Sequence, residues 1–174
     1  MTLGSLAEQA GRWQVRFTRT LPHPPEKVWR AITEPEHLRA WFPTTVDGER
    51  AAGAALRFTF PDGEGPEFNG TMLAYDPPSL LEFAWGPDVL RFELRPEGSG
   101  TVLTLVDTVA EKGKAARDGA GWHACLELLE YEVAGEEPAP ETKNRWAEVH
   151  PLYVEVMGPE ASTIGPPEGH PSAG

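Results

Sequence analysis

The chain contains 174 residues, of which 40% are hydrophobic and 9% aromatic, and it carries a formal net charge of −12. This length fits one domain able to bury roughly 70% of the surface that its unfolded form exposes. The negative charge opposes contact with a nucleic-acid backbone or an anionic membrane surface, so we expect neither as a partner. No apolar run reaches the ~18 to 20 residues that span a bilayer, and no basic and apolar leader opens the chain. We therefore expect a cytoplasmic domain.

Metal, cofactor and catalytic motifs are not recognisable in the sequence. The single cysteine, Cys125, excludes an internal disulfide and a multi-cysteine zinc site, and its setting in HACLELL is typical of a buried apolar residue rather than a nucleophile. The histidines do not form an H-E-x-x-H pair, and no glycine-rich phosphate loop joins a strand to a helix. No Ser, His and Asp set can be identified as a triad. The sequence therefore predicts no metal, no cofactor and no catalytic set.

The first elements are one strand and two short helices. Residues 1–12 form a lead, and apolar and polar residues then alternate over residues 13–20, as in a strand with one buried face. Pro25 can occupy the first turn of a helix without losing a hydrogen bond. Thr33 and Glu36 have the T-x-x-E spacing of a capping box, which predicts the start of a second short helix.

A meander of antiparallel strands is predicted from residue 45 to residue 108. Short apolar alternations are separated there by turn residues, so each strand contributes one apolar face. The parity is ambiguous only in FNGTMLAY, where either Met72 or its neighbours could face inward. Arg57, Arg91 and Arg95 fall on the outward parity, where we expect pairing with glutamates on the solvated face.

The C-terminal part is predicted to contain two helices. Residues 113–134 have apolar side chains at spacings of three and four, and the glycine that follows is a natural helix stop. Residues 136–143 read as a linker, and residues 144–158 as an amphipathic helix in which Pro151 must start a turn or introduce a kink. Residues 159–174 are rich in proline and glycine, which is typical of a tail or an extended arm.

Three stretches of the chain resemble the SRPBCC superfamily, in particular its bacterial members related to activators of the large heat-shock ATPase. PPEKVWRAITEPEHLRAWF resembles the opening motif of that family, GTMLAYDPPSLLEFAW its central strand pair, and GTVLTLVDTVAEKGKAARDGAGWHACLELLE its last strand and Gly-Trp helix. The resemblance implies an α+β helix-grip fold over residues 13–135. In that fold a curved antiparallel sheet of six to seven strands wraps around a long C-terminal helix, with two short helices after the first strand.

The helix-grip fold implies a cavity between the sheet and the long helix, and the inward parity supplies candidate ligand-binding residues for it. The apolar candidates are Trp41, Phe58, Phe60, Phe68, Met72, Phe83, Trp85, Phe92, Trp122 and Leu126. Asp107 continues the inward parity of the last strand, and His123 lies beside Trp122 on the helix. Each apolar candidate could equally be an ordinary core residue, Asp107 a cap of the strand-to-loop turn, and His123 a surface residue.

Three functions are consistent with this pattern. The first is binding of an apolar or aromatic small molecule, such as a lipid or a polyketide-like compound, in the cavity. The second is an enzyme of the cyclase or dehydratase type, in which Asp107 or His123 moves a proton. The third is a partner-binding module of the heat-shock ATPase activator type, in which the segment 144–158 covers the cavity mouth or forms a homodimer contact.

Overall fold

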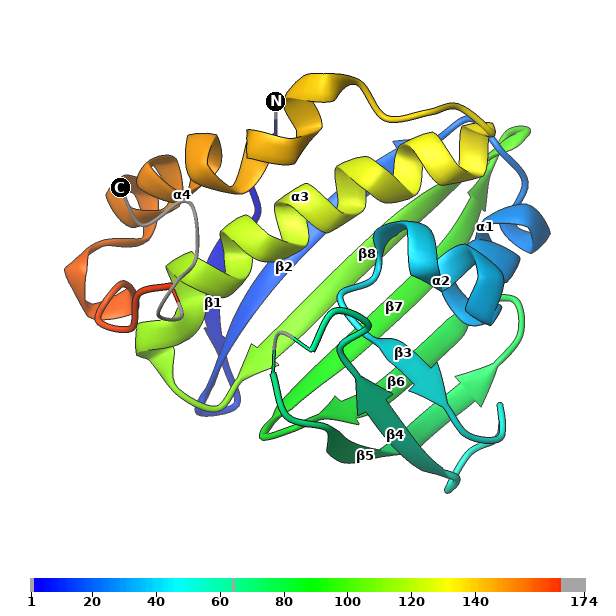
Figure 1. Cartoon of the computed structure of the whole chain (residues 1–174), viewed down its shortest axis with the longest axis horizontal. Helices are drawn as coiled ribbons and strands as arrows, with labels where there is room; N and C mark the ends of the chain where they lie inside the picture. The colour runs from blue at the N-terminus through cyan, green and yellow to red at the C-terminus, as the bar shows by residue number, and fades with distance from the viewer. Residues whose placement is uncertain (1, 64, 167–174) are drawn as a thin grey trace.

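The computed structural model describes residues 2–63 and 65–166. Eight strands form one antiparallel sheet in the order β1-β2-β8-β7-β6-β5-β4-β3 (Figure 1). The strands are β1 (Ser5–Gln9), β2 (Arg12–Leu21), β3 (Thr45–Asp47), β4 (Ala55–Thr59), β5 (Phe68–Asp76), β6 (Leu80–Trp85), β7 (Asp88–Glu97) and β8 (Gly100–Val109). The long strands β2, β8 and β7 pair along most of their length and form the continuous part of the sheet.

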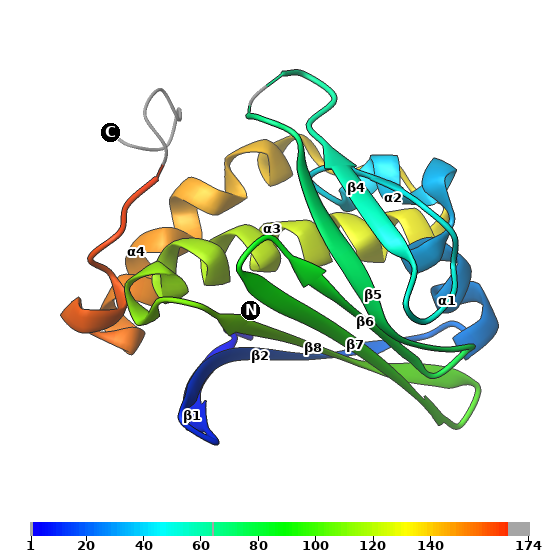
Figure 2. The ribbon, with the colours of Figure 1, turned by 90° about the horizontal axis from the view of Figure 1, so that it is seen from below.

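The sheet curves around one long helix. The helices are α1 (Pro25–Thr33), α2 (Pro35–Trp41), α3 (Ala115–Ala134) and α4 (Arg145–Met157), with short 3₁₀ turns η1 (Lys112–Lys114), η2 (Pro140–Asn144) and η3 (Pro159–Ala161). Figures 1 and 2 show α3 lying along the concave face of the sheet, with α1 and α2 near one end and α4 beside α3. The predicted α+β helix-grip fold is therefore confirmed.

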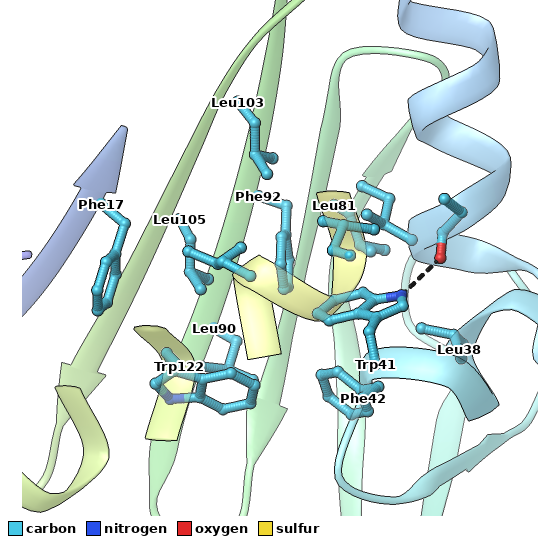
Figure 3. Packing of buried hydrophobic residues seen from close by; sticks show 14 of the residues in the cluster. Phe17, Leu38, Trp41, Phe42, Leu81, Leu90, Phe92, Leu103, Leu105 and Trp122 are labelled. Atoms are coloured by element: carbon cyan, nitrogen blue, oxygen red, sulfur yellow. Dashed lines mark hydrogen bonds between the residues drawn. The ribbon is translucent and has the colours of Figure 1, made fainter. Parts of the chain in front are cut away.

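The core forms where the inward faces of the strands meet the apolar stripe of α3. On β7, Leu90, Phe92 and Leu94 are buried and alternate with residues of higher exposure. Trp122 and Leu126 are buried on α3 at helical spacing, and Figure 3 shows Trp122 over Leu90 in this layer. One face of each strand is buried against one stripe of the helix. This explains why alternation of apolar and polar residues predicts the strands, and why apolar spacings of three and four predict the helix.

The sheet has one more strand than the largest number expected, because part of the predicted lead is a strand. Residues Ser5–Gln9 pair with β2 through a two-residue turn at Ala10 and Gly11, whose φ values are +51° and +78°. Two positive φ values match the twist of a tight hairpin. On the other face of the sheet, Arg91 Nε lies 2.6 Å from Glu93 and its Nη1 lies 3.2 Å from Glu82, which is the pairing predicted for an outward arginine.

The predicted capping box at the start of α2 is wrong. The N-cap is Glu34, which makes no side-chain cap bond, and Pro35 occupies the first turn. The Thr33 hydroxyl instead donates a hydrogen bond of 2.7 Å to the Trp29 carbonyl one turn earlier in α1. The hydroxyl is therefore engaged within α1, and Thr33 lies one residue before the N-cap of α2, so it does not cap that helix.

The C-terminal extension packs onto the rest of the domain. Helix α3 ends at Gly135 in the left-handed conformation, as predicted, with φ of +72°. Helix α4 runs through Pro151 without interruption, so this proline does not start a turn. Beyond it, Ala161 is fully buried and the Ile164 N–H donates a hydrogen bond of 3.1 Å to the Gly113 carbonyl. The rest of the predicted tail, residues 167–174, lies outside the described residues.

Candidate functional site

The space between α3 and the sheet is closed at the end near α1 and α2. Trp41 inserts from α2 between the sheet and α1, and its indole N–H donates a hydrogen bond of 2.9 Å to the Ala31 carbonyl (Figure 3). Its ring meets Phe92 edge-on, with centroids 6.1 Å apart, and Phe83 stacks on Phe92 at 6.3 Å. The gap left among these side chains is only about 10 Å³, too small for any organic ligand.

A pocket of about 520 Å³ opens at the other end, between the β6–β7 turn, the β4–β5 loop and the first half of α3. Its lining residues are Pro43, Phe60, Phe68, Trp85, Gly86, Pro87, Asp88, Lys114, Arg117, Asp118, Gly121, Trp122, Cys125 and Trp146. A volume of this size lies within the usual range for small-molecule sites.

Aromatic rings form most of the apolar walls of this pocket. Trp85 packs against Phe68 with centroids 4.8 Å apart and against Trp122 at 5.9 Å, both edge-to-face. Phe60 extends the same wall through Phe68, at 6.1 Å. On the opposite side Trp146, from α4, is anchored by a hydrogen bond of 3.2 Å from its indole N–H to the Arg117 carbonyl. Contacts of this kind hold the rings in place in the pocket wall.

Charged side chains form one end of the pocket. Lys114 Nζ lies 2.9 Å from both carboxylate oxygens of Asp88, and the Ala110 N–H donates a third hydrogen bond of 2.9 Å to that carboxylate. Arg117 Nε donates to Asp118 at 2.9 Å. Burial raises the pKa of Asp118, and the charges of Arg117 and Lys114 oppose that rise. These residues come from the start of β7 and the start of α3, which the fold brings together.

Asp107 lies behind the pocket wall and is fully buried. The Trp122 indole N–H donates a hydrogen bond of 3.1 Å to its Oδ2, while its Oδ1 has no hydrogen-bond partner among residues 2–63 and 65–166. Burial raises the pKa of Asp107 well above the usual value, and the charges of Asp118 and Asp88 add to the rise. The neutral, protonated acid is therefore favoured at this position.

His123 points to the other side of α3, toward α4 and the N-terminal segment. Its Nδ1 lies 2.8 Å from the Tyr153 hydroxyl, which also accepts a hydrogen bond of 2.8 Å from the Gly4 N–H. The hydroxyl therefore satisfies both groups when it donates its proton to Nδ1. Burial lowers the pKa of His123 to about 4, and the nearby Arg19 acts in the same direction.

Comparison with known proteins places the chain by family. Residues 22–134, well over half of the chain, match the family model of the Activator of Hsp90 ATPase homolog 1-like proteins. The chain belongs to this family. Among curated proteins, none matches it.

Several solved structures share the fold of this Hsp90 ATPase activator-like chain. CalU16 from Micromonospora echinospora is 24% identical, with a TM-score of 0.70 over 88% of this chain and 98% of its own. A conserved protein of unknown function from Enterococcus faecalis, EF2215, is 22% identical with a TM-score of 0.73 over 87% of this chain and 88% of its own. The BPP1335 protein from Bordetella parapertussis is 27% identical with a TM-score of 0.67 over 88% and 94%. In general terms, the fold indicates binding of a ligand or a partner.

The predicted ligand-binding residues of this Hsp90 ATPase activator-like chain fall into five places. Phe60, Phe68, Trp85 and Trp122 line the open pocket, whereas Trp41, Met72, Phe83 and Phe92 line the small closed gap. Phe58 and Leu126 are buried in the core, Asp107 lies behind the pocket wall, and His123 lies beside α4. The ambiguous parity of β5 is resolved by a register shift between Met72 and Ala74: Met72 is buried and Leu73 is 48% exposed.

Sequence reasoning missed much of the polar end and one wall. Asp88, Lys114 and Asp118 were not candidates, and only the tertiary fold brings them together. Trp146 could have been found, because it lies on the apolar stripe of the predicted amphipathic helix. Cys125 was taken for a buried residue. It is partly exposed at the pocket wall, and burial of its thiol raises the pKa to about 12, which disfavours the nucleophilic thiolate.

Proposed function

We propose that this protein binds an apolar, largely aromatic small molecule in the open pocket between α3, the β6–β7 turn and the β4–β5 loop. The supporting observation is a pocket of about 520 Å³ whose walls are aromatic and whose polar groups gather at one end. Rigid aromatic walls with few convergent polar groups are typical of small-molecule sites. Each 100 Å² of apolar surface buried there would contribute about 2.5 kcal/mol to affinity.

Gly121 offers a test because it lies on α3 at the pocket wall and faces open space. A Cβ atom at this position would meet only Trp146, at 3.8 Å from its indole nitrogen and 3.9 Å from Cδ1, both ordinary contacts. Gly121→Leu should place a branched side chain inside the pocket, and so obstruct it, without disturbing the helix. Gly121→Ala should leave the pocket open, and should raise the free energy of unfolding by up to about 1 kcal/mol through helix propensity.

Binding is measured with Nile red, a neutral aromatic dye whose fluorescence rises in apolar surroundings. We expect Gly121→Leu to weaken dye binding at least about tenfold, equivalent to about 1.4 kcal/mol, while thermal unfolding shows both variants to be at least as stable as the wild type. Gly121→Ala should bind the dye like the wild type. If the folded leucine variant binds the dye unchanged, the pocket is not the binding site.

The two alternatives receive less support from the geometry. An enzyme that uses Asp107 and His123 together would need both side chains at one cavity, but Asp107 bonds to Trp122 whereas His123 bonds to Tyr153 on the other side of α3. Helix α4, which suggested a dimer contact, packs on α3 of its own chain, although Val156 remains 64% exposed.

Among the helices of the described residues, none is long and apolar enough to cross a bilayer.

A further inference from the structure

A second pocket, of about 480 Å³, lies on the other side of α3 from the open pocket. Its walls come from the N-terminal segment, the end of β2, the middle of α3 and the start of α4, and all of its lining side chains are polar or charged. It shares no lining residue with the open pocket. A ligand of this second pocket is therefore independent of the proposed function.

Arg19 is a cation of the second pocket that has no carboxylate partner. On β2 it follows the alternation of Phe17 and Leu21, which are both buried, so its side chain leaves the strand on the concave face. Its Nη1 and Nη2 donate hydrogen bonds of 3.1 and 2.9 Å to the main-chain carbonyls of Thr18 and Thr2. Among the described residues, no carboxylate lies within ion-pair distance of this guanidinium. Its charge is therefore available to a ligand.

His123 adds a hydrogen-bond donor beside this cation. Its Nδ1 accepts the proton of the Tyr153 hydroxyl, so Nε2 carries the hydrogen of the neutral ring. In the described part of the chain Nε2 has no hydrogen-bond partner, although the residue is only 5% exposed and lines the second pocket. A largely buried N–H without a partner is costly, so it favours a ligand atom that accepts a hydrogen bond.

The charged residues that line the second pocket balance in number but are not all paired. Both carboxylate oxygens of Glu127 accept hydrogen bonds from Arg145, of 2.6 and 3.1 Å, and Arg145 also pairs with Glu148. Glu130, about one turn further along α3, forms no hydrogen bond or ion pair with the described residues. Partial burial raises the pKa of Glu130 and the charge of Arg19 opposes that rise, so the two charges interact without forming an ion pair. The pocket thus offers one unpaired cation and one unpaired carboxylate.

The end of β2 offers main-chain groups to the same pocket. β1 pairs with β2 only as far as Arg16, whereas β2 continues to Leu21. Within the described ranges no other strand covers this edge, and Thr18 and Thr20 line the pocket. An open edge of this kind can pair with an extended peptide. Figures 1 and 2 show β2 running beside α3, so a peptide on this edge would lie along the helix.

The spacing of the polar groups indicates the length and charge of the ligand. His123 and Glu130 are seven residues apart on α3, which is about 10.5 Å along the helix axis. An extended chain spans at most about 3.3–3.6 Å per residue, so a tripeptide reaches about 10 Å from its amino to its carboxyl end. A simple anion would leave Glu130 unpaired and would be opposed by the net charge of −12, whereas a zwitterion has no net charge.

We propose that the second pocket binds short peptides of about three residues as zwitterions. The terminal carboxylate is held by Arg19 and His123, the terminal ammonium group lies at Glu130, and the main chain follows the open edge of β2. Because β2 and α3 run in the same direction (Figure 1), the peptide lies antiparallel to β2.

Three probes of tripeptide size test the proposal on the full chain. Triglycine is the zwitterion, N-acetylglycylglycine has the same backbone without the ammonium group, and triglycinamide lacks the carboxylate charge. Binding is measured by titration in two-dimensional NMR spectra of the isotope-labelled protein. We expect triglycine to bind at least about tenfold more tightly than triglycinamide, which loses the charge-assisted hydrogen bonds. It should bind at least about threefold more tightly than N-acetylglycylglycine, because an ion pair with an exposed carboxylate contributes less. The amide signals of Thr18 and Thr20 should shift.

Two variants separate the contributions of the two charges. Arg19→Gln should bring triglycine to the affinity of triglycinamide, and Glu130→Gln should bring it to the affinity of N-acetylglycylglycine. Arg16→Gln and Glu136→Gln make the same changes at exposed positions outside the pocket and should leave all affinities unchanged. Thermal unfolding checks that each variant folds. Glu130 is exposed, so its variant provides the test even if Arg19→Gln does not fold.

The outcomes distinguish this site from the open pocket. If both charge-deleted probes bind the wild type as tightly as triglycine does, recognition of a zwitterion is wrong. If the folded Glu130→Gln variant still prefers triglycine to N-acetylglycylglycine, the ammonium group does not lie at Glu130 and the proposal is overturned. If triglycine displaces Nile red, the peptide binds in the open pocket instead. Dye binding without any triglycine binding would overturn the peptide site and leave the proposed function intact.

Discussion

The two ends of the space beneath α3 are lined by aromatic residues of the same inward parity, but they differ about fiftyfold in free volume. At the closed end, Trp41 and Phe42 from the end of α2 pack onto Phe83 and Phe92, and about 10 Å³ remains. At the open end the pocket measures about 520 Å³. Strand parity therefore determines which side chains face inward, and the neighbouring helices determine whether the space between them is filled.

The closed end is filled because α2 inserts a large side chain there. Among the described residues, no equivalent side chain enters the open end, where α3 presents two small residues, Gly121 and Cys125, and Trp146 of α4 lies at the side. The closed and open ends also differ in their polar groups. The closed end has the Trp41 N–H bonded to the Ala31 carbonyl, whereas the open end has the buried Asp88 and Asp107.

The largest predicted effect compares one phenylalanine at each end. Phe92 is 1% exposed at the closed end, so Phe92→Ala should lower the free energy of unfolding by about 3–5 kcal/mol. Phe60 is partly exposed at the pocket wall, so Phe60→Ala should cost less than about 1.5 kcal/mol and should weaken Nile red binding. Urea unfolding followed by circular dichroism measures both. Equal losses would mean that the two ends are packed alike.

The fold was predictable from the sequence because the periodic segments and the family motifs agree along residues 13–135. The strand β1 was missed for a physical reason. SLAEQ has one partly buried leucine, Leu6, and its hairpin turn uses Ala10 and Gly11 rather than a typical asparagine and glycine pair. β1 forms because it can pair with the edge of β2, and no pattern within residues 5–9 reveals that this edge is available.

The site was predictable only in part. Alternation placed Trp85 on the face that lines the pocket, and it placed Asp107 inward, but it left the face of Phe68 undecided. Neighbouring residues on a helix point about 100° apart, so Trp122 can face the sheet while His123 faces α4, and the two polar candidates do not meet. The charged end depends on the start of β7 lying against the start of α3, a long-range contact that spacing does not show.

The next prediction concerns the other side of α3, where polar groups tie α4 and the N-terminal segment to the domain. Tyr153 is fully buried, and its hydroxyl serves both Gly4 and His123. Tyr153→Phe leaves two buried groups without a partner, so we expect a loss of about 2–3 kcal/mol in the free energy of unfolding. Tyr131→Phe, the same change at a partly exposed position of α3, is the control and should be near neutral.

Since the hydroxyl bonds to Gly4 and His123 and Tyr153 does not line the pocket, Nile red binding by Tyr153→Phe should stay at the wild-type level in native conditions. A loss of dye binding without a loss of stability would show that α4 controls the open end, and it would contradict the separation of the two sides of α3 described above.

The smallest predicted effect is a dependence of stability on pH that originates at His123. Its pKa is lowered to about 4 in the folded state, by burial first and then by Arg19, and is about 6.5 in the unfolded chain. Between these values the unfolded chain binds more protons, so stability falls as the pH falls. From pH 7 to pH 5 this loss of stability amounts to up to ~2 kcal/mol, because the imidazole must stay neutral in order to accept the Tyr153 proton.

Buried Asp107 has its pKa raised and acts in the opposite sense, so the pH dependence of the wild type contains the contributions of both residues. The difference between the wild type and His123→Gln isolates the histidine: the glutamine variant should lack this loss, and parallel curves for the two proteins would contradict the assignment.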